Sequence, residues 1–342
     1  MKKILLTLVG LIVLAGIIFA AKIVVARPND PQEFVNTALT NSLEINSAKK
    51  MTVIQIAADA NGANGGKFTL AVTGKIADAA EYLPTLNYQI ESAVELNLDG
   101  QKISGKLKGE LKIIDEVFYG KFEPITLVGA PEEVLARLDA VNQLAGKWHS
   151  LSFAKLRKLD PKIATEFEEQ KTRQLERRAN LKNLFATTNF LLVKKMPINL
   201  TELQPVEVVL NTDVLASDTF LTEIEKMFTP TNSKNPLALD EATWEKIRET
   251  ITALADKIDS TITLQINHDN NFLRTCSAEV NLALADFGIP QFPNGTVQIF
   301  LDSQNSEINQ PQLITTPTEF TELDPSELLP RTTEEVFDVV EE

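Results

Sequence analysis

The most regular pattern in the chain lies between Met51 and about Lys121, where apolar and polar residues alternate with a period of two. It is clearest over residues 102–113, where apolar residues and glycines alternate with lysines, a serine and a glutamate. This alternation is typical of antiparallel strands that bury one face and expose the other. Asn61-Gly62, Asn64-Gly65-Gly66 and Asp99-Gly100 supply turn residues that tolerate positive φ. The region therefore predicts a meander of long strands with one apolar face.

Six large side chains on the apolar side of this meander are candidates for lining a ligand cavity. They are Phe68, Leu70, Leu96, Leu98, Leu107 and Leu111. Glycines at the same alternate positions, such as Gly105 and Gly109, would leave room for curvature or for a large group to approach. The alternative is that the six side chains pack directly against helices, with no hollow between them.

Helical patterns precede and follow the meander. Asp30 as a cap and Pro31 at the first position predict a helix that buries Phe34, Ala38 and Leu39. Further helices are predicted at residues 131–145, 160–187, 218–228 and 240–254, and further strands at 115–121, 147–151, 189–200, 205–210, 260–268, 271–284 and 296–302. The polar stretch 168–178 of the second of these helices should bridge two halves or lie on the surface. This order indicates an α+β fold with an antiparallel sheet rather than alternating βαβ units.

The N-terminal segment is strongly apolar. Ile4 to Ala21 form an unbroken apolar run behind Lys2 and Lys3, long enough to span a bilayer core. We expect residues 1–27 to be a single transmembrane anchor, with the main domain extracytoplasmic. The alternative is a secretory signal, cleaved after Ala21 or Ala26, that leaves a secreted protein.

The segments beyond the anchor divide by composition. Residues 28–317 are predicted to form one extracytoplasmic domain, with a polar helical insertion near 160–187. Residues 318–342 are acidic and interrupted by prolines, which predicts a disordered tail.

Composition narrows the classes of function. With 44% hydrophobic residues the chain can build a core, and its net charge of −14 disfavours nucleic-acid binding. The two histidines, His149 and His268, are far apart, and the one cysteine, Cys276, sits in a strand pattern that suggests a buried thiol. No metal or catalytic motif is present, so we expect a non-enzyme without a cofactor.

Three short sequence segments complete the order of elements along the chain. After the capped helix and the meander come the strings VFYGKF (117–122) and GKWHSL (146–151), and a late hairpin precedes the extended stretch ITTP (314–317). This layout resembles the envelope proteins grouped around the LolA carrier and the LppX and LprG lipoproteins. The resemblance implies a curved antiparallel half-barrel closed by helices, whose concave apolar face holds lipid or an acyl chain. The chain departs from those lipoproteins because no lipidation cysteine follows the apolar run.

Together these patterns favour a non-catalytic, membrane-anchored extracytoplasmic protein. It would bind a hydrophobic ligand, a lipid or a lipoprotein acyl chain, on the concave face of a curved sheet. Its partners would be the membrane, through Ile4 to Ala21, and that ligand. The alternative is a structural or protein-interaction module of the cell envelope that binds no small molecule.

Overall fold

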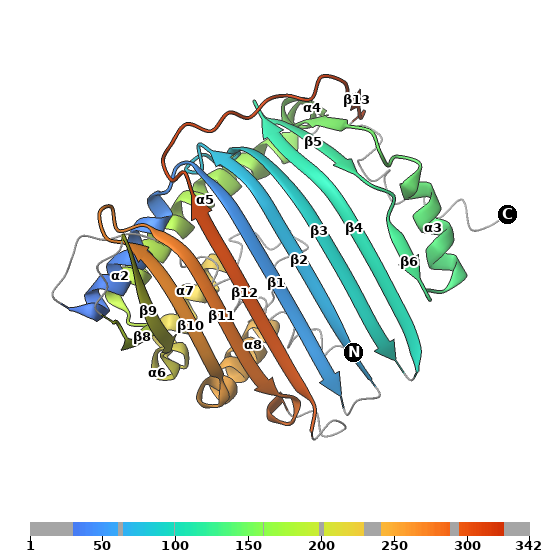
Figure 1. Cartoon of the computed structure of the whole chain (residues 1–342). Coiled ribbons are helices and arrows are strands. Elements are labelled where there is room, and N and C mark those ends of the chain that lie inside the picture. The colour runs from blue at the N-terminus through green and yellow to red at the C-terminus, as the bar shows by residue number, and fades with distance from the viewer. Residues whose placement is uncertain are drawn as a thin grey trace.

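In the part of the chain that the structure describes, 13 strands form one β-sheet (Figure 1). The computed structural model describes residues 30–60, 64–98, 100–159, 161–197, 202–228, 241–287 and 294–324. The strands are β1 (Ala48–Ala60), β2 (Asn64–Ala77), β3 (Thr85–Leu98), β4 (Gln101–Ile114), β5 (Val117–Phe122), β6 (Thr126–Val128), β7 (His149–Ser152), β8 (Leu191–Lys195), β9 (Leu203–Leu210), β10 (Asp259–Asn267), β11 (Leu273–Ala283), β12 (Thr296–Ser306) and β13 (Thr321–Glu322).

The strands follow the order β13-β7-β5-β4-β3-β2-β1-β12-β11-β10-β9-β8, and β6 pairs with β4. Every described pair is antiparallel except β13 with β7. The two ends of the order do not pair among the described strands, so the sheet is not closed into a barrel. The predicted α+β class with an antiparallel sheet is therefore confirmed.

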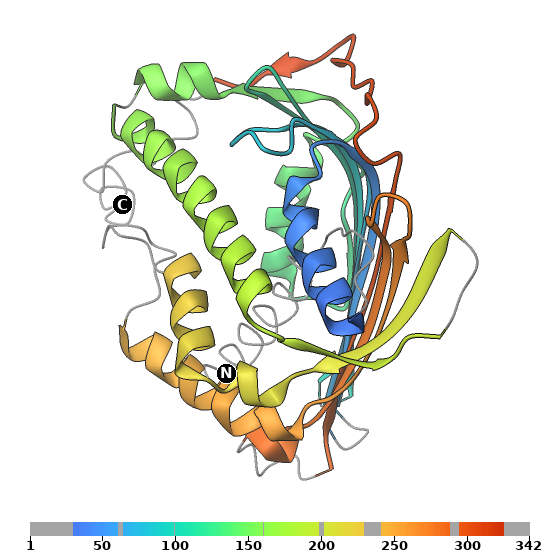
Figure 2. The ribbon, with the colours of Figure 1, turned by 90° about the vertical axis from the view of Figure 1, so that its left-hand side faces the viewer.

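The helices lie on one side of the sheet, which is seen nearly edge-on and curved in Figure 2. They are α2 (Pro31–Asn41), α3 (Glu132–Asn142), α4 (Phe153–Leu159), α5 (Pro161–Thr187), α6 (Thr212–Leu215), α7 (Asp218–Phe228) and α8 (Glu241–Leu254), with short 3₁₀ turns η1 (Ser42–Glu44), η2 (Ala255–Lys257) and η3 (Leu284–Phe287). No helix among the described residues is both long and apolar enough to cross a membrane. The predicted anchor, Ile4 to Ala21, lies outside the described residues.

Helix α2 begins as its sequence predicts. The Asp30 side chain accepts a hydrogen bond from the backbone N–H of Gln32 at 2.8 Å, and Pro31 takes the first helical position. Phe34, Ala38 and Leu39 are buried, which confirms the predicted face.

Two hairpin turns differ from the prediction. Asp115 and Glu116 have φ of 49° and 59° and form the two-residue turn between β4 and β5, so the predicted strand 115–121 begins only at Val117. Gly65 and Gly66, predicted as turn residues, lie within β2 and pair with β1. The other predicted turn there, Asn61-Gly62, lies outside the described residues.

The main core lies between the helices and strands β9 to β12. Its largest fully buried side chains include Trp244 from α8, Phe220 from α7 and Phe185 from α5, packed with Ile262 and Leu264 of β10. Because these strands alternate cleanly between buried and exposed positions, their buried side faces the helices and their other side faces solvent.

Strand β8 ends the sheet next to α2, where Gln32 completes its hydrogen bonding. The Gln32 amide nitrogen donates to the Leu191 carbonyl oxygen at 2.7 Å, and its oxygen accepts from the Val193 N–H at 3.1 Å. One side chain thus supplies the donor and the acceptor that another strand would supply, which protects this edge from pairing with a second chain.

Helix α5 connects the main core to the far end of the meander. Its C-terminal part buries Leu184 and Phe185, while Phe167, nearer its start, packs edge-on against Tyr82 with ring centroids 4.7 Å apart. The predicted polar helix near 160–187 therefore exists and bridges two parts of the structure, and the ion pair between Glu169 and Arg173 (3.1 Å) lies in its polar middle.

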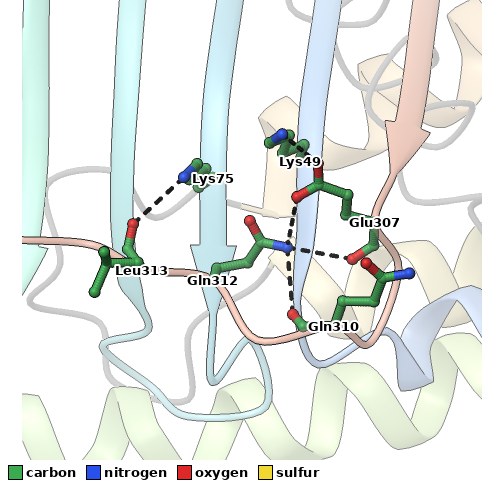
Figure 3. A network of polar contacts seen from close by, with 6 residues as sticks. All are labelled: Lys49, Lys75, Glu307, Gln310, Gln312 and Leu313. Carbon is green, nitrogen blue, oxygen red and sulfur yellow. Dashed lines mark hydrogen bonds and ion pairs between the residues drawn. The ribbon is translucent and has the colours of Figure 1, made fainter.

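The segment after β12 runs along the side of the sheet that faces away from the helices (Figures 1 and 3). Glu307 pairs with Lys49, and this interaction lowers the pKa of the Glu307 carboxyl. Lys75 donates to the Leu313 carbonyl at 3.4 Å, and Lys112 donates to that of Thr315 at 3.2 Å. Lysines of three meander strands thereby hold this segment.

The same segment continues into the predicted tail. Thr321 and Glu322 form β13, the Thr321 N–H donates to the Trp148 carbonyl at 2.8 Å, and Phe320 packs edge-on against Tyr119. Part of the stretch 318–342 therefore belongs to the sheet. Residues 325–342 lie outside the described residues.

Candidate functional site

The register of the sheet assigns each residue of the meander to one of its two faces. Ile56 is paired with the buried Ile299 of β12, Phe68 with Ile56, and Val94 with Phe68. Side chains of directly paired residues point to the same side of a sheet. These residues therefore face the same side as the core of β9 to β12, which we call the inner face.

The inner face is continuous across seven strands. One row of directly paired residues comprises Ile262, Ala278, Leu301, Ile54, Leu70, Ser92 and Leu107. The first three are buried beneath the helices, whereas the last four are only partly buried. The boundary falls at β1, where Ile54 and Ile56 pack against the edge of the main core.

We call the partly buried region the apolar face. Its members are inner-face hydrophobic residues of the first four strands that are not fully buried: Ile54, Ile56, Phe68, Leu70, Val72, Ile90, Val94, Leu96, Ile103, Leu107 and Leu111. At the start of β1 the same face is closed, because Ala48, Ile76 and Leu86 are buried in a second, smaller cluster with Ile45 and Ile308. Each keeps some exposure, and Phe68 is 38% exposed. A soluble domain normally buries such a continuous set of aliphatic side chains, so partial exposure here marks a candidate binding surface.

Five of the six predicted lining residues belong to this face. Phe68 and Leu70 come from β2, Leu96 from β3, and Leu107 and Leu111 from β4. The backbone of the sixth, Leu98, pairs with Gln101 at the end of β3, and its side chain lies outside the described part. The register thus brings together the residues that the alternation singled out.

The inner-face glycines do not leave the simple gaps that the sequence suggested. A Cβ on Gly66 would meet the Leu96 side chain at 2.7 Å, and one on Gly105 would meet the Leu127 and Val94 side chains at 3.0 and 3.2 Å. Neighbouring side chains therefore lean over these glycines, so the glycines allow dense cross-strand packing within the face.

The opposite face of the same strands is polar. Lys67, Thr69 and Thr73 point outward from β2, and Lys108 from β4 pairs with Glu91 from β3 at 2.7 Å. The predicted division into one apolar and one wet face is confirmed for the described meander.

Three inner-face residues near the start of β1 were missed by the sequence reasoning. Lys50, Gly74 and Tyr88 lie side by side in one row across β1, β2 and β3. A Cβ on Gly74 would lie 2.6 Å from Cδ1 of Tyr88, so the tyrosine ring leans over the glycine. Extending the period-two alternation of β1 back by two residues from Thr52 would have placed Lys50 on the inner face.

Burial changes the acid–base behaviour of this row. Desolvation lowers the pKa of the Lys50 ammonium and raises the pKa of the Tyr88 phenol to about 12. Both shifts have the same cause, since each charged form is taken out of water without compensation.

The Tyr88 shift predicts how stability changes at alkaline pH. Because its pKa is higher in the folded protein, the unfolded chain releases this proton first, and stability is lost as pH rises from 10 towards 12. Two pKa units correspond to about 2.7 kcal/mol. Urea titrations from pH 8 to 12 should therefore show wild type losing stability relative to Tyr88→Phe by an amount approaching this figure. A difference between the two proteins that does not vary with pH contradicts the shift.

The residues considered for catalysis or metal binding are not brought together. His149 lies on β7, where its Nε2 donates a hydrogen bond to the Leu144 carbonyl oxygen at 2.9 Å, whereas His268 follows β10 near Phe34. Cys276 is buried in β11, as predicted. Within the described residues, no group of three His, Cys, Asp or Glu side chains could hold a metal ion.

Comparison with known proteins adds no relative. No family model matches the chain, and no match is found among the curated proteins or the solved structures. The function must therefore be argued from the apolar face itself.

Proposed function

We propose that the chain is a non-catalytic binding protein for a hydrophobic ligand, a lipid or the acyl chain of a lipoprotein. In this proposal the curved sheet and its helices act as a half-barrel, and the ligand lies on the apolar face of β1 to β4. The resemblance to LolA-like envelope proteins suggested the same arrangement from sequence.

One observation carries the proposal: a single inner face is divided into a packed part and a partly exposed part. In β9 to β12, its side chains are buried under α2, α5, α7 and α8. In β2 to β4, the same face buries Ile76 and Leu86 in a second, smaller cluster, and away from that cluster it continues with apolar residues that stay partly exposed. An apolar ligand would complete the burial that the helices begin.

The physical driving force would be the removal of apolar surface from water. Each Å² buried contributes about 25 cal/mol, so a ligand that covers a few hundred Å² gains several kcal/mol before the cost of association. The polar outer face, crossed by the segment after β12, offers no comparable surface. The proposal therefore restricts binding to one side of the sheet.

Binding of the uncharged fluorescent probe N-phenylnaphthylamine tests this function. The full chain, freed of detergent and lipid, should bind the probe saturably with increased fluorescence, and an added phospholipid should displace it. A linear, unsaturable signal, or one that lipid does not reduce, contradicts the proposal and favours an interaction module without a small-molecule ligand.

We further propose that Ile4 to Ala21 anchors the chain in a membrane, with the main domain on the extracytoplasmic side. The apolar run and its preceding lysines support this placement. The intact mass of the chain in the membrane fraction tests it, because a soluble product that lacks the run would instead indicate a cleaved signal.

A further inference from the structure

The apolar face contains one residue that does not suit a purely apolar ligand. Among the described inner-face positions of β1 to β4, Lys50 is the only charged residue. The other charged residues of these strands, such as Lys49, Lys67 and Lys106, point outward. A lone cation on this side needs an explanation, because charged groups are rarely buried unless they are paired.

Lys50 has no partner among the residues that the structure describes. It forms no ion pair or hydrogen bond with them, although its side chain is partly buried, and desolvation lowers its pKa. Its outward-facing neighbour Lys49, by contrast, pairs with Glu307. Desolvation of an unpaired ammonium destabilises the ligand-free protein, so an apolar residue at this position would make that form more stable.

Lys50 shares its row with a second polar donor on the inner face. Gly74, its direct neighbour on β2, has no side chain, and beyond it the Tyr88 ring leans over the glycine towards β1. The Tyr88 hydroxyl also forms no hydrogen bond with the described residues, so one ammonium and one hydroxyl donor share a row. On the β12 side the row continues with Asn305, whose amide is already used by the Leu273 carbonyl.

The apolar face extends from this row in one direction along the strands. From Lys50 to Ile56, whose row contains Phe68 and Val94, the inner face of β1 spans about 20 Å, at about 3.3 Å per residue. A single leaflet of a bilayer's hydrocarbon core is about 15 Å thick, half of the full core. One extended acyl chain therefore fits between the Lys50 row and the row of Phe68 and Val94.

We propose that the ligand of the apolar face is a long-chain carboxylate, whose acidic head pairs with Lys50 and accepts a hydrogen bond from Tyr88. This inference rests on the proposed function and specifies its ligand. A carboxylate carries one charge and matches the one cation of the row. A phosphate ester would place more negative charge against that cation than it can balance.

Displacement of N-phenylnaphthylamine by dodecanoate, dodecanol and dodecyl phosphate at pH 7.5 tests the inference on the full chain. Wild type should bind dodecanoate at least about tenfold more tightly than dodecanol, since a hydrogen-bonded charge pair replaces a neutral contact. It should also bind dodecanoate more tightly than dodecyl phosphate. Lys50→Met should reduce the preference for dodecanoate over dodecanol to about twofold or less and leave dodecanol binding unchanged.

Two further variants keep the test decisive. Lys50→Arg, which retains the charge, should retain the preference, and Lys67→Met, which removes an outward-facing lysine of β2, should behave as wild type. Circular dichroism and a urea midpoint no lower than that of wild type would establish that Lys50→Met is folded. An unfolded Lys50→Met would contradict the premise that this charge destabilises the ligand-free protein.

The outcomes separate this inference from the proposed function. The carboxylate assignment is overturned by any of three results: equal binding of dodecanoate and dodecanol by wild type, an undiminished preference in Lys50→Met, or tighter binding of dodecyl phosphate. Each of these results leaves the proposed function, binding of an apolar ligand, intact. Failure of all three compounds to displace the probe overturns both.

Discussion

Leu264→Ala should lower the free energy of unfolding by about 3 kcal/mol, whereas Leu107→Ala should lower it by about 1 kcal/mol. Both leucines lie on the inner face of the same sheet, in adjacent rows. Leu264 is 1% exposed and packs beneath the helices, so its truncation leaves a cavity. Leu107 keeps part of its surface in water, so its truncation removes less burial.

Urea titrations of the full chain with an unchanged slope would measure both losses. Thr73→Ala, on the exposed outer side of β2, is the control and should change stability by less than about 0.5 kcal/mol. Similar losses for the two leucines would show that β4 is packed as tightly as β10, and the distinction on which the binding site depends would be lost.

Leu70→Glu should weaken binding of N-phenylnaphthylamine at least tenfold, which corresponds to about 1.4 kcal/mol or more. Leu70 lies centrally on the apolar face, between Ile54 and Ser92. A ligand that covered this position would have to desolvate the introduced carboxylate, and no cation lies in its row among the described residues.

Thr73→Glu is the matched control for this substitution. It adds the same charge to the same strand, but it points outward, is exposed, and faces the uncharged Met51 and Gln89 across the strands. Its affinity for the probe should stay within about twofold of wild type. Equal weakening by both variants would indicate a general charge effect, and no weakening by Leu70→Glu would place the probe elsewhere.

Several elements were predictable because their signals are local. The alternation over residues 102–113 gave both faces of β4, and the apolar spacing of residues 218–228 matched the bounds of α7. The cap at Asp30 gave the start of α2. In each case neighbouring residues alone determine the element.

Other features depend on contacts between residues far apart in sequence. The pairing of β1 with β12, which joins the meander to the main core, leaves no trace in either strand's pattern. Strand β13 has only two residues, and β7 stabilises it from outside. Local alternation also could not show that helices bury the inner face of β9 to β12 and leave that of β2 to β4 partly exposed.

Lys50 illustrates the same limit within the candidate site. The sequence predicts the meander from Met51 onward and assigns Lys49 and Lys50 to neither face. The structure starts β1 at Ala48, which turns Lys49 outward to Glu307 and Lys50 inward to the row of Gly74 and Tyr88. Because β1 starts three residues before the predicted strand, the sequence did not reveal that a charged residue lies on the inner face.

The most direct measurement is photo-crosslinking of the full chain with a long-chain alcohol that carries a diazirine in its tail, followed by peptide mass spectrometry at residue resolution. The account predicts crosslinks at inner-face residues of β2 to β4, such as Phe68, Leu70 and Leu107, which excess lipid suppresses. Crosslinks at the intervening outward residues, such as Lys67 and Lys108, or solely in other parts of the chain, would contradict it.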